Sequence, residues 1–373
     1  MGLTALQNQA GGLGAAVAEY RGATTAARFG DSQAEFAALH SGCGVFDLGF
    51  RAKISLTGGD RVRWLNGMVT NNIRDLAAGH GVYAFLLNPQ GRILGDLYSY
   101  NRGESGVSPS IMVDVDRAQA EKILATFDHY IIMDDVEIKD LSSELTAVGI
   151  AGPKSRDVLR AAGMEIPDLE PLQFHTAQCD CACGCVNCTF VRRDDPAGES
   201  YEIWLAPEHV KSVWDSLVKA GAVPAGSEAL ELHRIASGIP QFGVDIRERD
   251  LPQETEQARA LNFNKGCYIG QEIVERIRSR GAVHRKFTGF VADAPVSPGS
   301  KIVAGEKEVG EITSAASVIL AGAERHIALG YIRREAGTPG REVSIAGIRA
   351  SVTSMPLSDA AVERENSLEQ RPA

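Results

Sequence analysis

The sequence predicts an α+β protein in which two α+β units precede a small β-barrel. Three observations support this prediction. The chain of 373 residues is longer than one hydrophobic core usually serves, so two or three domains are expected. The order strand, turn, helix occurs in two successive stretches before residue 238, and short strands punctuated by Gly and Pro fill residues 287–355.

Composition and charge narrow the class of protein. The 48 acidic and 38 basic residues give a net charge of −10, which argues against binding nucleic acid through bulk electrostatics. No apolar run is long enough to span a bilayer, and the N-terminus lacks a secretory signal pattern. Seven cysteines, five of them crowded together, fit a reducing compartment. We expect a cytoplasmic protein with no membrane partner, and we take it to be a monomer.

The two ends of the chain carry little pattern. Residues 1–30 are rich in Ala and Gly, and we expect a flexible N-terminal segment with a short helix at Ala15–Ala18. The polar tail, residues 358–373, is expected to be disordered.

The first α+β unit begins with a strand. Lys53–Thr57 alternates apolar and polar residues, and Asp60 is placed to cap the helix that follows. Val82–Leu87 and Arg92–Tyr100 are expected to pair as a hairpin, because a short turn containing Pro and Gly joins them. Asp116 then caps the next helix.

The second unit repeats this order. A strand is expected at Leu145–Ile150, followed by a helix that Gly152-Pro153 opens. Further helices are expected at Pro207–Ala220 and Glu228–Ser237, each ended by a glycine.

A cysteine motif precedes the last predicted helix, Gln271–Arg278. Gly266 and Gly270 bracket Cys267 and a tyrosine, which suits a tight loop that leads into a helix. Near a helix start and beside Lys265, Cys267 would favour the thiolate form and is a candidate reactive residue. The alternative is a buried small hydrophobic residue in a glycine turn.

The string Lys265–Glu272 (KGCYIGQE) resembles the signature of the YgfZ family, folate-binding paralogues of the glycine-cleavage T-protein, an aminomethyltransferase. The resemblance implies three lobes around a central folate channel and tetrahydrofolate, or a reduced folate derivative, as cofactor. It also implies that Lys265 and Tyr268 contribute to folate binding and that Cys267 acts chemically. The T-protein does not carry this cysteine motif, so the resemblance is closer to the YgfZ branch.

The resemblance also sets the domain limits that we expect. A folate-binding region would span residues 31–285 and a C-terminal β-barrel residues 286–357. Within the folate-binding region, one lobe would combine residues 31–142 with 235–285, and the other would be residues 143–234.

Asp96 is the first candidate site residue. It falls on the same strand face as Leu94, Tyr98 and Tyr100, where burial would raise the pKa of its carboxyl unless a partner compensates. The alternative is a place at a sheet edge or a bond to a backbone turn. The surrounding Gly91–Leu97 resembles the T-protein segment whose aspartate faces the pterin and the transferred one-carbon unit.

Two glutamates and an arginine extend the candidate site. The run Gly198–Ile203 resembles one in which a glutamate holds the pterin edge in relatives. Either Glu199 or Glu202 could fill that role. The alternative is a solvated acidic loop. The segment around Arg234 resembles one whose arginine lies near the folate, and a guanidinium suits the carboxylates of a folate tail. The alternative for Arg234 is a helical pair with Glu231.

Two further clusters have less specific patterns. Cys179–Cys188 contains five cysteines, but only Cys185 and Cys188 have the spacing of a metal-binding pair, so we expect a variable connection and no metal site. The basic run Arg276–Lys286 could contact RNA or a polyglutamate tail, although such runs are more often solvated helix faces.

Three functions follow from these residues. The first is a tetrahydrofolate-binding YgfZ-like protein that assists the assembly or repair of iron–sulfur enzymes, with iron–sulfur client or assembly proteins as partners. The second is an aminomethyltransferase-like one-carbon transferase in which Asp96 orients or deprotonates the attacking amine. The third is an accessory protein for tRNA modification that uses Arg276–Lys286. The Cys267 motif favours the first, and whether the protein is an enzyme is left open.

Overall fold

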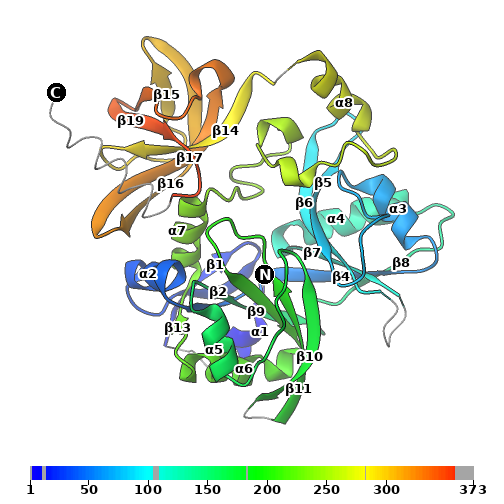
Figure 1. Cartoon of the computed structure of the whole chain (residues 1–373). Coiled ribbons are helices and arrows are strands. Elements are labelled where there is room, and N and C mark those ends of the chain that lie inside the picture. Colours follow the sequence, from blue (N-terminus) through cyan, green and yellow to red (C-terminus); the bar gives the residue numbers. More distant parts are fainter. Residues whose placement is uncertain (1, 11–13, 104–108, 182–183, 282, 358–373) are drawn as a thin grey trace. The chain divides into compact units, whose positions relative to one another are not determined.

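The computed structural model describes residues 2–10, 14–103, 109–181, 184–281 and 283–357 (Figure 1). The chain divides into two compact units. Unit 1 comprises Met1–Pro89, Leu94–Leu230 and Arg259–Gln271, and unit 2 comprises Gln90–Ile93, Glu231–Ala258 and Glu272–Ala373. The two units are described separately.

The first sheet of unit 1 has five strands in the order β5-β6-β7-β4-β8. Its strands are β4 (Arg51–Thr57), β5 (Gly81–Leu87), β6 (Ile93–Asn101), β7 (Ile111–Asp116) and β8 (Glu137–Asp140). Helices α3 (Arg61–Met68) and α4 (Arg117–Tyr130) pack on one face through a shared core, in which Trp64 and Phe127 meet edge to face at 5.2 Å. The predicted strands at 53–57, 82–87 and 92–100 are thereby confirmed within a residue or two.

The second sheet of unit 1 has six strands in the order β10-β11-β12-β9-β3-β13. They are β3 (Gly44–Asp47), β9 (Thr146–Ala151), β10 (Phe174–Cys181), β11 (Gly184–Arg192), β12 (Ser200–Leu205) and β13 (Val223–Pro224). Its main core lies against α5 (Ser155–Ala161) and α6 (Val210–Lys219), where Trp214 and Leu217 are buried. Helix α2 (Ser32–Ser41) also belongs to unit 1, whereas α7 (Ser227–Ser237) begins in unit 1 and continues in unit 2.

The N-terminal segment differs from the expectation. Residues 16–20 form strand β1 (Ala16–Tyr20), not a helix, and they pair with β2 (Ala23–Arg28). Leu6, in α1 (Ala5–Ala10), is fully buried, so the prediction of a loosely held segment is wrong. Gly22, in the β1–β2 turn with φ +93°, packs against α4; an added Cβ would lie 2.4 Å from the backbone nitrogen of Ala118. The small residues that we associated with flexibility allow this close packing.

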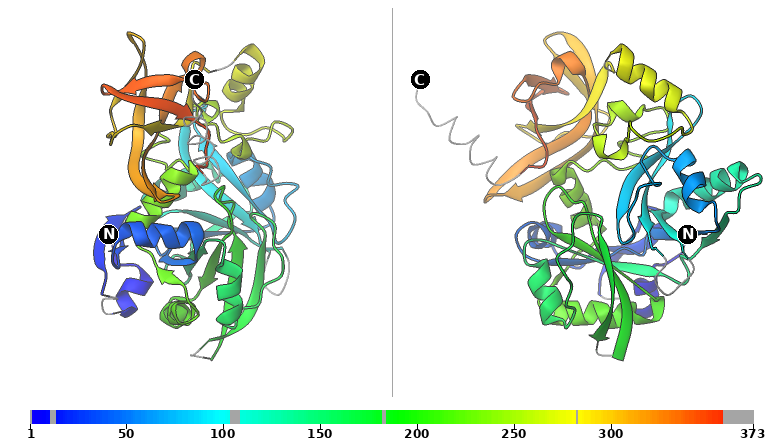
Figure 2. Two further views of the ribbon diagram at one scale, coloured as in Figure 1. Left: turned by 60° about the vertical axis from the view of Figure 1, so that its left-hand side comes forward. Right: turned by 45° about the vertical axis from the view of Figure 1, so that its right-hand side comes forward.

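Unit 2 contains the predicted β-barrel. Six strands close in the order β14-β17-β16-β15-β18-β19, visible in yellow to red in Figure 2. They are β14 (Arg285–Ala292), β15 (Lys301–Ala304), β16 (Lys307–Leu320), β17 (Ala323–Arg333), β18 (Glu342–Ile345) and β19 (Ile348–Thr353). Alternate side chains such as Phe290, Ile312 and Ile332 fill its core. The predicted fold class, α+β units followed by a barrel, is confirmed.

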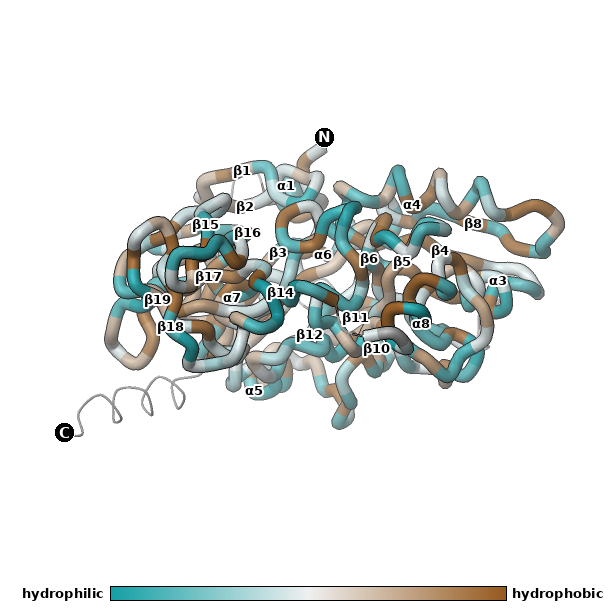
Figure 3. The backbone as a smooth tube through the Cα atoms, turned by 90° about the horizontal axis from the view of Figure 1, so that it is seen from above, coloured by the Kyte–Doolittle hydropathy of each residue, from teal (hydrophilic) through white to brown (hydrophobic). Residues whose placement is uncertain are grey.

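Hydrophobic residues recur at short intervals along the chain in Figure 3 instead of forming one long run. Within the described residues, the structure contains no helix with the length and apolar character that crossing a membrane requires. The polar tail from residue 358, expected to be disordered, lies outside the described residues.

Candidate functional site

Asp96 lies on β6, an interior strand of the five-stranded sheet, and two side chains hold its carboxylate. Its Oδ2 accepts a hydrogen bond from the Tyr83 hydroxyl at 2.7 Å. Its Oδ1 accepts one from Nε2 of Gln119 at 2.8 Å, and Oε1 of Gln119 accepts from the Asp96 backbone N–H at 3.1 Å. Tyr83 comes from β5 and Gln119 from the first turn of α4, so three elements fix this carboxylate.

The surroundings of Asp96 alter its acidity. Burial, and next the negative charge of Asp116, raise the pKa of the Asp96 carboxyl above its usual value. The hydrogen bonds from Gln119 and Tyr83 oppose this shift only in part. A carboxylate with a raised pKa is a better proton acceptor near neutral pH than an exposed one. The direction agrees with the shift expected from the sequence.

An arginine and an aspartate from distant segments lie beside the same tyrosines. The Arg259 guanidinium lies 4.6 Å from the centroid of the Tyr83 ring and forms an ion pair with Asp194. The Tyr98 hydroxyl donates to Oδ1 of Asp194 at 3.3 Å, and the Tyr83 and Tyr98 rings lie 5.0 Å apart. Aromatic faces, a carboxylate and a cation therefore meet around Asp96. We call Tyr83, Asp96, Tyr98, Asp194 and Arg259 the Asp96 cluster.

A buried charge network lies next to this cluster. Arg51 donates to Asp116 at 2.6 Å and to Asp114 at 3.2 Å. Lys53 Nζ lies 2.8 Å from Asp114 Oδ1, but without the alignment of a hydrogen bond, so this pair is held by charge. Burial alone would raise the pKa of Asp114; Arg51 and Lys53 outweigh it and leave that pKa below its usual value.

The structure separates the two candidate glutamates. Glu202 is buried on β12, where it accepts a hydrogen bond from Trp204 Nε1 at 2.8 Å and lies 3.6 Å from Lys53 Nζ. Glu199 precedes β12 and accepts from the Tyr201 hydroxyl at 2.6 Å. Glu202 thus joins the buried charge network, whereas Glu199 bonds to a side chain of the core beside α5 and α6. Contact of either residue with a pterin remains a prediction.

The ammonium of Lys265 is directed at the backbone of another segment. It donates to the carbonyls of Asn66, Val69 and Asn71, each at 2.6 Å. Burial, and next the charge of Arg74, lower its pKa to about 7. The three carbonyl acceptors oppose this lowering of the pKa. They favour the charged form of Lys265, because only the charged amine has three N–H donors. Lys265 therefore acts as a clamp, and a direct contact with folate remains a prediction.

The clamp fixes the loop that carries the cysteine motif. Lys265 Nζ lies 5.0 Å from the centroid of the buried Tyr268 ring. The Ile269 N–H donates to the Gly67 carbonyl at 3.1 Å. Cys267 itself is exposed, which excludes the alternative of a buried hydrophobic residue. It precedes the first residue of α8 (Gln271–Arg280) by four positions, and the helix starts at the predicted residue.

The Arg234 guanidinium donates four hydrogen bonds to residues of unit 2. Nε donates to Glu231 at 2.8 Å, and Nη1 donates to Asp245 at 2.7 Å and to the Ile239 carbonyl at 3.2 Å. Nη2 donates to the Ser314 hydroxyl at 2.9 Å and contacts Glu231 at 2.8 Å. The helical pair with Glu231 is therefore present. A contact of Arg234 with a folate tail remains a prediction, and it would have to replace one of these bonds.

The cysteine cluster lies on two strands, β10 and β11, that pair with each other. Strands β10 and β11 pair Cys179 with Val186 and Ala177 with Cys188. Cys179 and Cys188 are buried, whereas Cys185 is exposed. The side chains of residues 180–183 lie outside the described set. Within that set, no group of three or more His, Cys, Asp or Glu residues is arranged to hold a metal ion.

The basic run from residue 276 divides between a helix and a strand. On α8, Arg278 is exposed and pairs with Glu275 at 3.5 Å, as expected for a solvated helix face. Arg285, on β14, instead pairs with Asp250 at 2.6 Å and Glu254 at 2.9 Å. Arg285 is thus engaged within unit 2, and RNA binding by the run remains a prediction.

The fold and these residues define a class of α+β protein with a barrel at its C-terminal end. The solved structure of glycine cleavage system aminomethyltransferase T from Bartonella henselae shares this fold, with a TM-score of 0.83 at 20% identity over 95% of this chain and 97% of that one. Residues 6–265 match the GCVT N-terminal domain, and residues 285–359 match the glycine cleavage T-protein C-terminal barrel domain. The chain belongs to the glycine cleavage T-protein family.

Curated relatives extend over nearly the whole chain. An aminomethyltransferase of Streptomyces coelicolor is 28% identical over 359 residues, which cover 93% of this chain and 94% of that protein. An aminomethyltransferase of Rubrobacter xylanophilus is 28% identical over 338 residues, covering 89% and 87% of the two chains.

Several members of the site were not predicted from the sequence. Gln119, Asp194 and Arg259 reach Asp96 and its tyrosines from three separate segments, and none lies in a recognisable motif. The sequence did carry a signal for Lys53. A lysine inside a strand with buried neighbours needs a carboxylate partner, and Asp114 is that partner.

Proposed function

We propose that this protein binds tetrahydrofolate or another reduced folate and acts as a one-carbon transferase of the aminomethyltransferase kind. The observation that carries the proposal is Asp96, a carboxylate fixed by Tyr83 and Gln119 whose pKa is raised by burial. The names of the curated relatives support the same reaction class.

The Asp96 cluster has the chemistry that a folate requires. The rings of Tyr83 and Tyr98 offer flat faces for a bicyclic heteroaromatic ring. Asp96 can accept from ring N–H groups, and the side chain of Arg259, 34% exposed, can attract a carboxylate tail. These residues would hold the folate, and we expect Glu202 to stay within the buried network.

Bound tetrahydrofolate would supply the amine that accepts a one-carbon unit. The protein's part is to orient that amine and to receive its proton at an Asp96 carboxylate oxygen. Gln119 and Tyr83 keep the carboxylate in one orientation, so little reorganisation is needed when the proton moves.

A second candidate is the YgfZ-like role in the assembly or repair of iron–sulfur enzymes. The specific observation in its favour is Cys267, an exposed thiol on a loop that Lys265 fixes. A thiol held in this way suits transient contact with a client protein or a cluster, which a folate enzyme does not need.

Calorimetric titration with tetrahydrofolate tests the shared part of both candidates. Asp96→Asn should weaken binding about tenfold or more, since a charged acceptor is lost, while the fold is kept. Asp215→Asn, which removes a surface partner of Lys211, is the matched control and should bind as wild type. Absence of heat at millimolar folate would refute folate binding.

Cys267→Ser separates the two candidates. A one-carbon transferase should retain its turnover in this variant. The YgfZ-like role requires that Cys267→Ser bind folate normally yet fail to restore iron–sulfur enzyme activity in cells that lack the endogenous protein. Full rescue by the Ser variant would eliminate the second candidate.

A further inference from the structure

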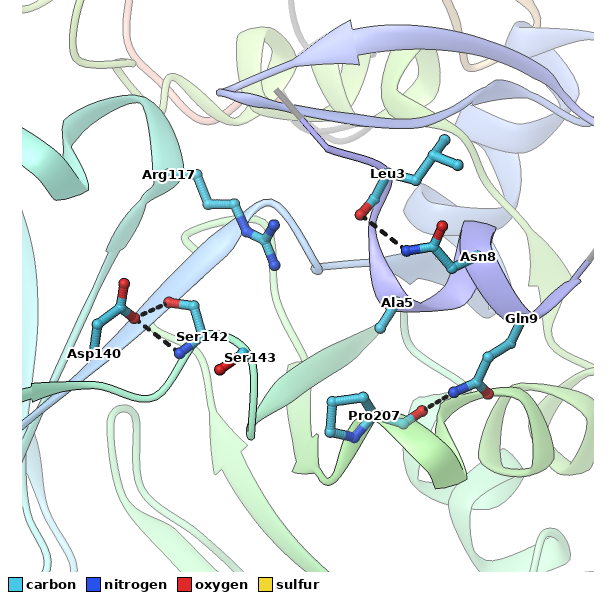
Figure 4. Close-up of a pocket in the computed structure, with 9 residues that line it drawn as sticks. All are labelled: Leu3, Ala5, Asn8, Gln9, Arg117, Asp140, Ser142, Ser143 and Pro207. Carbon is cyan, nitrogen blue, oxygen red and sulfur yellow. Dashed lines mark hydrogen bonds between the residues drawn. The ribbon is translucent and has the colours of Figure 1, made fainter.

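A cavity of about 570 Å³ opens on the surface of unit 1 (Figure 4). Its walls come from the N-terminal segment with α1, the first residue of α4, the turn after β8 and the start of a short 3-10 helix at Pro207–His209. The lining residues are Leu3, Ala5, Asn8, Gln9, Arg117, Asp140, Ser142, Ser143 and Pro207. None of them belongs to the Asp96 cluster.

The cavity contains a cation, Arg117, that forms no ion pair at contact distance with any residue that the structure describes. Arg117 is half-buried, its Nε is inaccessible to solvent, and within the described parts of the chain no oxygen accepts from its guanidinium. Asp47 feels the charge of Arg117, but the Asp47 carboxylate already accepts from Thr4, Thr25 and the Gly49 N–H. The Nε–H of Arg117 is removed from water without an acceptor, which is costly, so an anion in the cavity that accepts from it would be stabilised.

The same cavity contains an anion with an open oxygen. Oδ1 of Asp140 accepts from the Ser142 N–H at 2.9 Å and from its hydroxyl at 2.5 Å. Oδ2 accepts from no donor among the residues that the structure describes, and in Figure 4 no bond reaches it. Arg117 and Asp140 do not form an ion pair with each other, although both line the cavity. The cavity therefore presents two separated charges of opposite sign.

We propose that this cavity binds a zwitterionic amino acid, with its carboxylate on Arg117 and its ammonium on Asp140. A planar guanidinium matches a carboxylate through two parallel N–H donors, and the free carboxylate oxygen matches an ammonium. The Ser143 hydroxyl and the Asn8 amide provide further polar contacts, and Leu3 and Pro207 provide an apolar wall. A ligand with a single charge would leave one of the two protein charges without a partner. The proposal is independent of the folate site.

Saturation-transfer NMR titrations test the proposal. Glycine and 6-aminohexanoate are the zwitterionic probes, with short and long charge separation, and acetate and methylammonium are the singly charged controls. At least one zwitterion should bind about tenfold tighter than either control, since two charge-assisted contacts form instead of one. Arg117→Gln and Asp140→Asn should each weaken that binding about tenfold. Arg160→Gln, which removes an exposed pair with Asp157, should not.

Three results would overturn the proposal. Equal binding of acetate, with no effect of Asp140→Asn, would mean that the cavity takes a simple anion. Loss of probe binding in Asp96→Asn but not in Arg117→Gln would place the probe in the Asp96 cluster. Absence of binding by either zwitterion would refute the site while leaving tetrahydrofolate titrations unaffected. Asp140 is exposed, so its variant provides the test even if Arg117→Gln fails to fold.

Discussion

The ammonium of Lys53 lies 3.6 Å from Oε2 of Glu202 and so connects the five-stranded sheet of unit 1 to the six-stranded sheet. The same Nζ lies 2.8 Å from Asp114 and 4.5 Å from the centroid of the Trp204 ring. The Lys53 side chain is fully buried, so these neighbours take the place of water around its ammonium.

Lys53→Met should destabilise the protein by about 3–5 kcal/mol, because it leaves Asp114 and Glu202 buried with one partner fewer. A carboxyl whose pKa is lower in the folded than in the unfolded state, where it is about 3.9, stabilises the fold at any pH above about 3.9. This contribution is lost as the pH falls through the pKa of the folded state. Removing Lys53 raises the folded pKa of Asp114, so acid unfolding should begin at a higher pH. Urea and acid titrations measure both effects.

Lys211→Met is the control for this variant. Lys211 forms an exposed pair with Asp215, and such pairs contribute little to stability. An unchanged acid-unfolding midpoint in Lys53→Met would contradict the role of Lys53 in the network.

Tyr83→Phe should raise the pKa of Asp96 further, because the lost hydroxyl donates to the charged carboxylate. Any reaction that needs the carboxylate form will then require a higher pH, and the acid side of its pH profile will move upward. Carbon-13 NMR titration of the Asp96 carboxyl measures the shift without requiring activity. Tyr98→Phe, whose hydroxyl donates to Asp194, should leave this pKa nearly unchanged.

Lys265→Met should cost roughly 2–4 kcal/mol, since three buried carbonyls lose a charged donor. Hydrogen exchange of residues 262–270 should accelerate more than that of the sheets, because the loop loses its anchor. Lys301→Met, which removes only exposed ion pairs, is the control. Unchanged exchange in the loop would contradict the clamp.

Arg234→Lys should destabilise unit 2 by about 2–4 kcal/mol, because lysine cannot reproduce the contacts to Asp245, Ser314 and the Ile239 carbonyl. The folate affinity of the folded variant should equal that of wild type. Calorimetry together with thermal unfolding tests both statements, with the exposed Arg276→Lys as control. Weaker folate binding without loss of stability would instead support the folate-tail contact.

Cys188→Ser should cost about 1–3 kcal/mol, because a hydroxyl replaces a thiol in the core beside α5 and α6. Cys185→Ser should be neutral, because this thiol is exposed on the same hairpin. Urea unfolding of the two single variants measures the difference. Equal stabilities would mean that the buried Cys188 thiol contributes no more to the fold than the exposed Cys185 thiol.

The local sequence pattern predicted the strands well, but it did not predict the side-chain contacts between distant segments. The strands at 82–87 and 92–100 follow from periodicity, and the placement of Asp96 on an apolar face follows from them. Arg259 and Gln119 meet that face only through tertiary folding, which a local pattern does not encode. The β1 strand was missed because alanine favours helix in isolation, and pairing with β2 overrides that preference.

The positions of Lys265 and its three carbonyl acceptors in the chain fix the order in which these groups of unit 1 are synthesised. The Lys265 ammonium bonds to carbonyls 194–199 residues earlier in the chain. At a translation rate of about 5–20 residues per second, these carbonyls emerge roughly 10–40 s before their donor. Residues 231–258, which belong to unit 2, are made within that interval. The loop that displays Cys267 can therefore adopt its final form only after the ribosome has completed most of the chain.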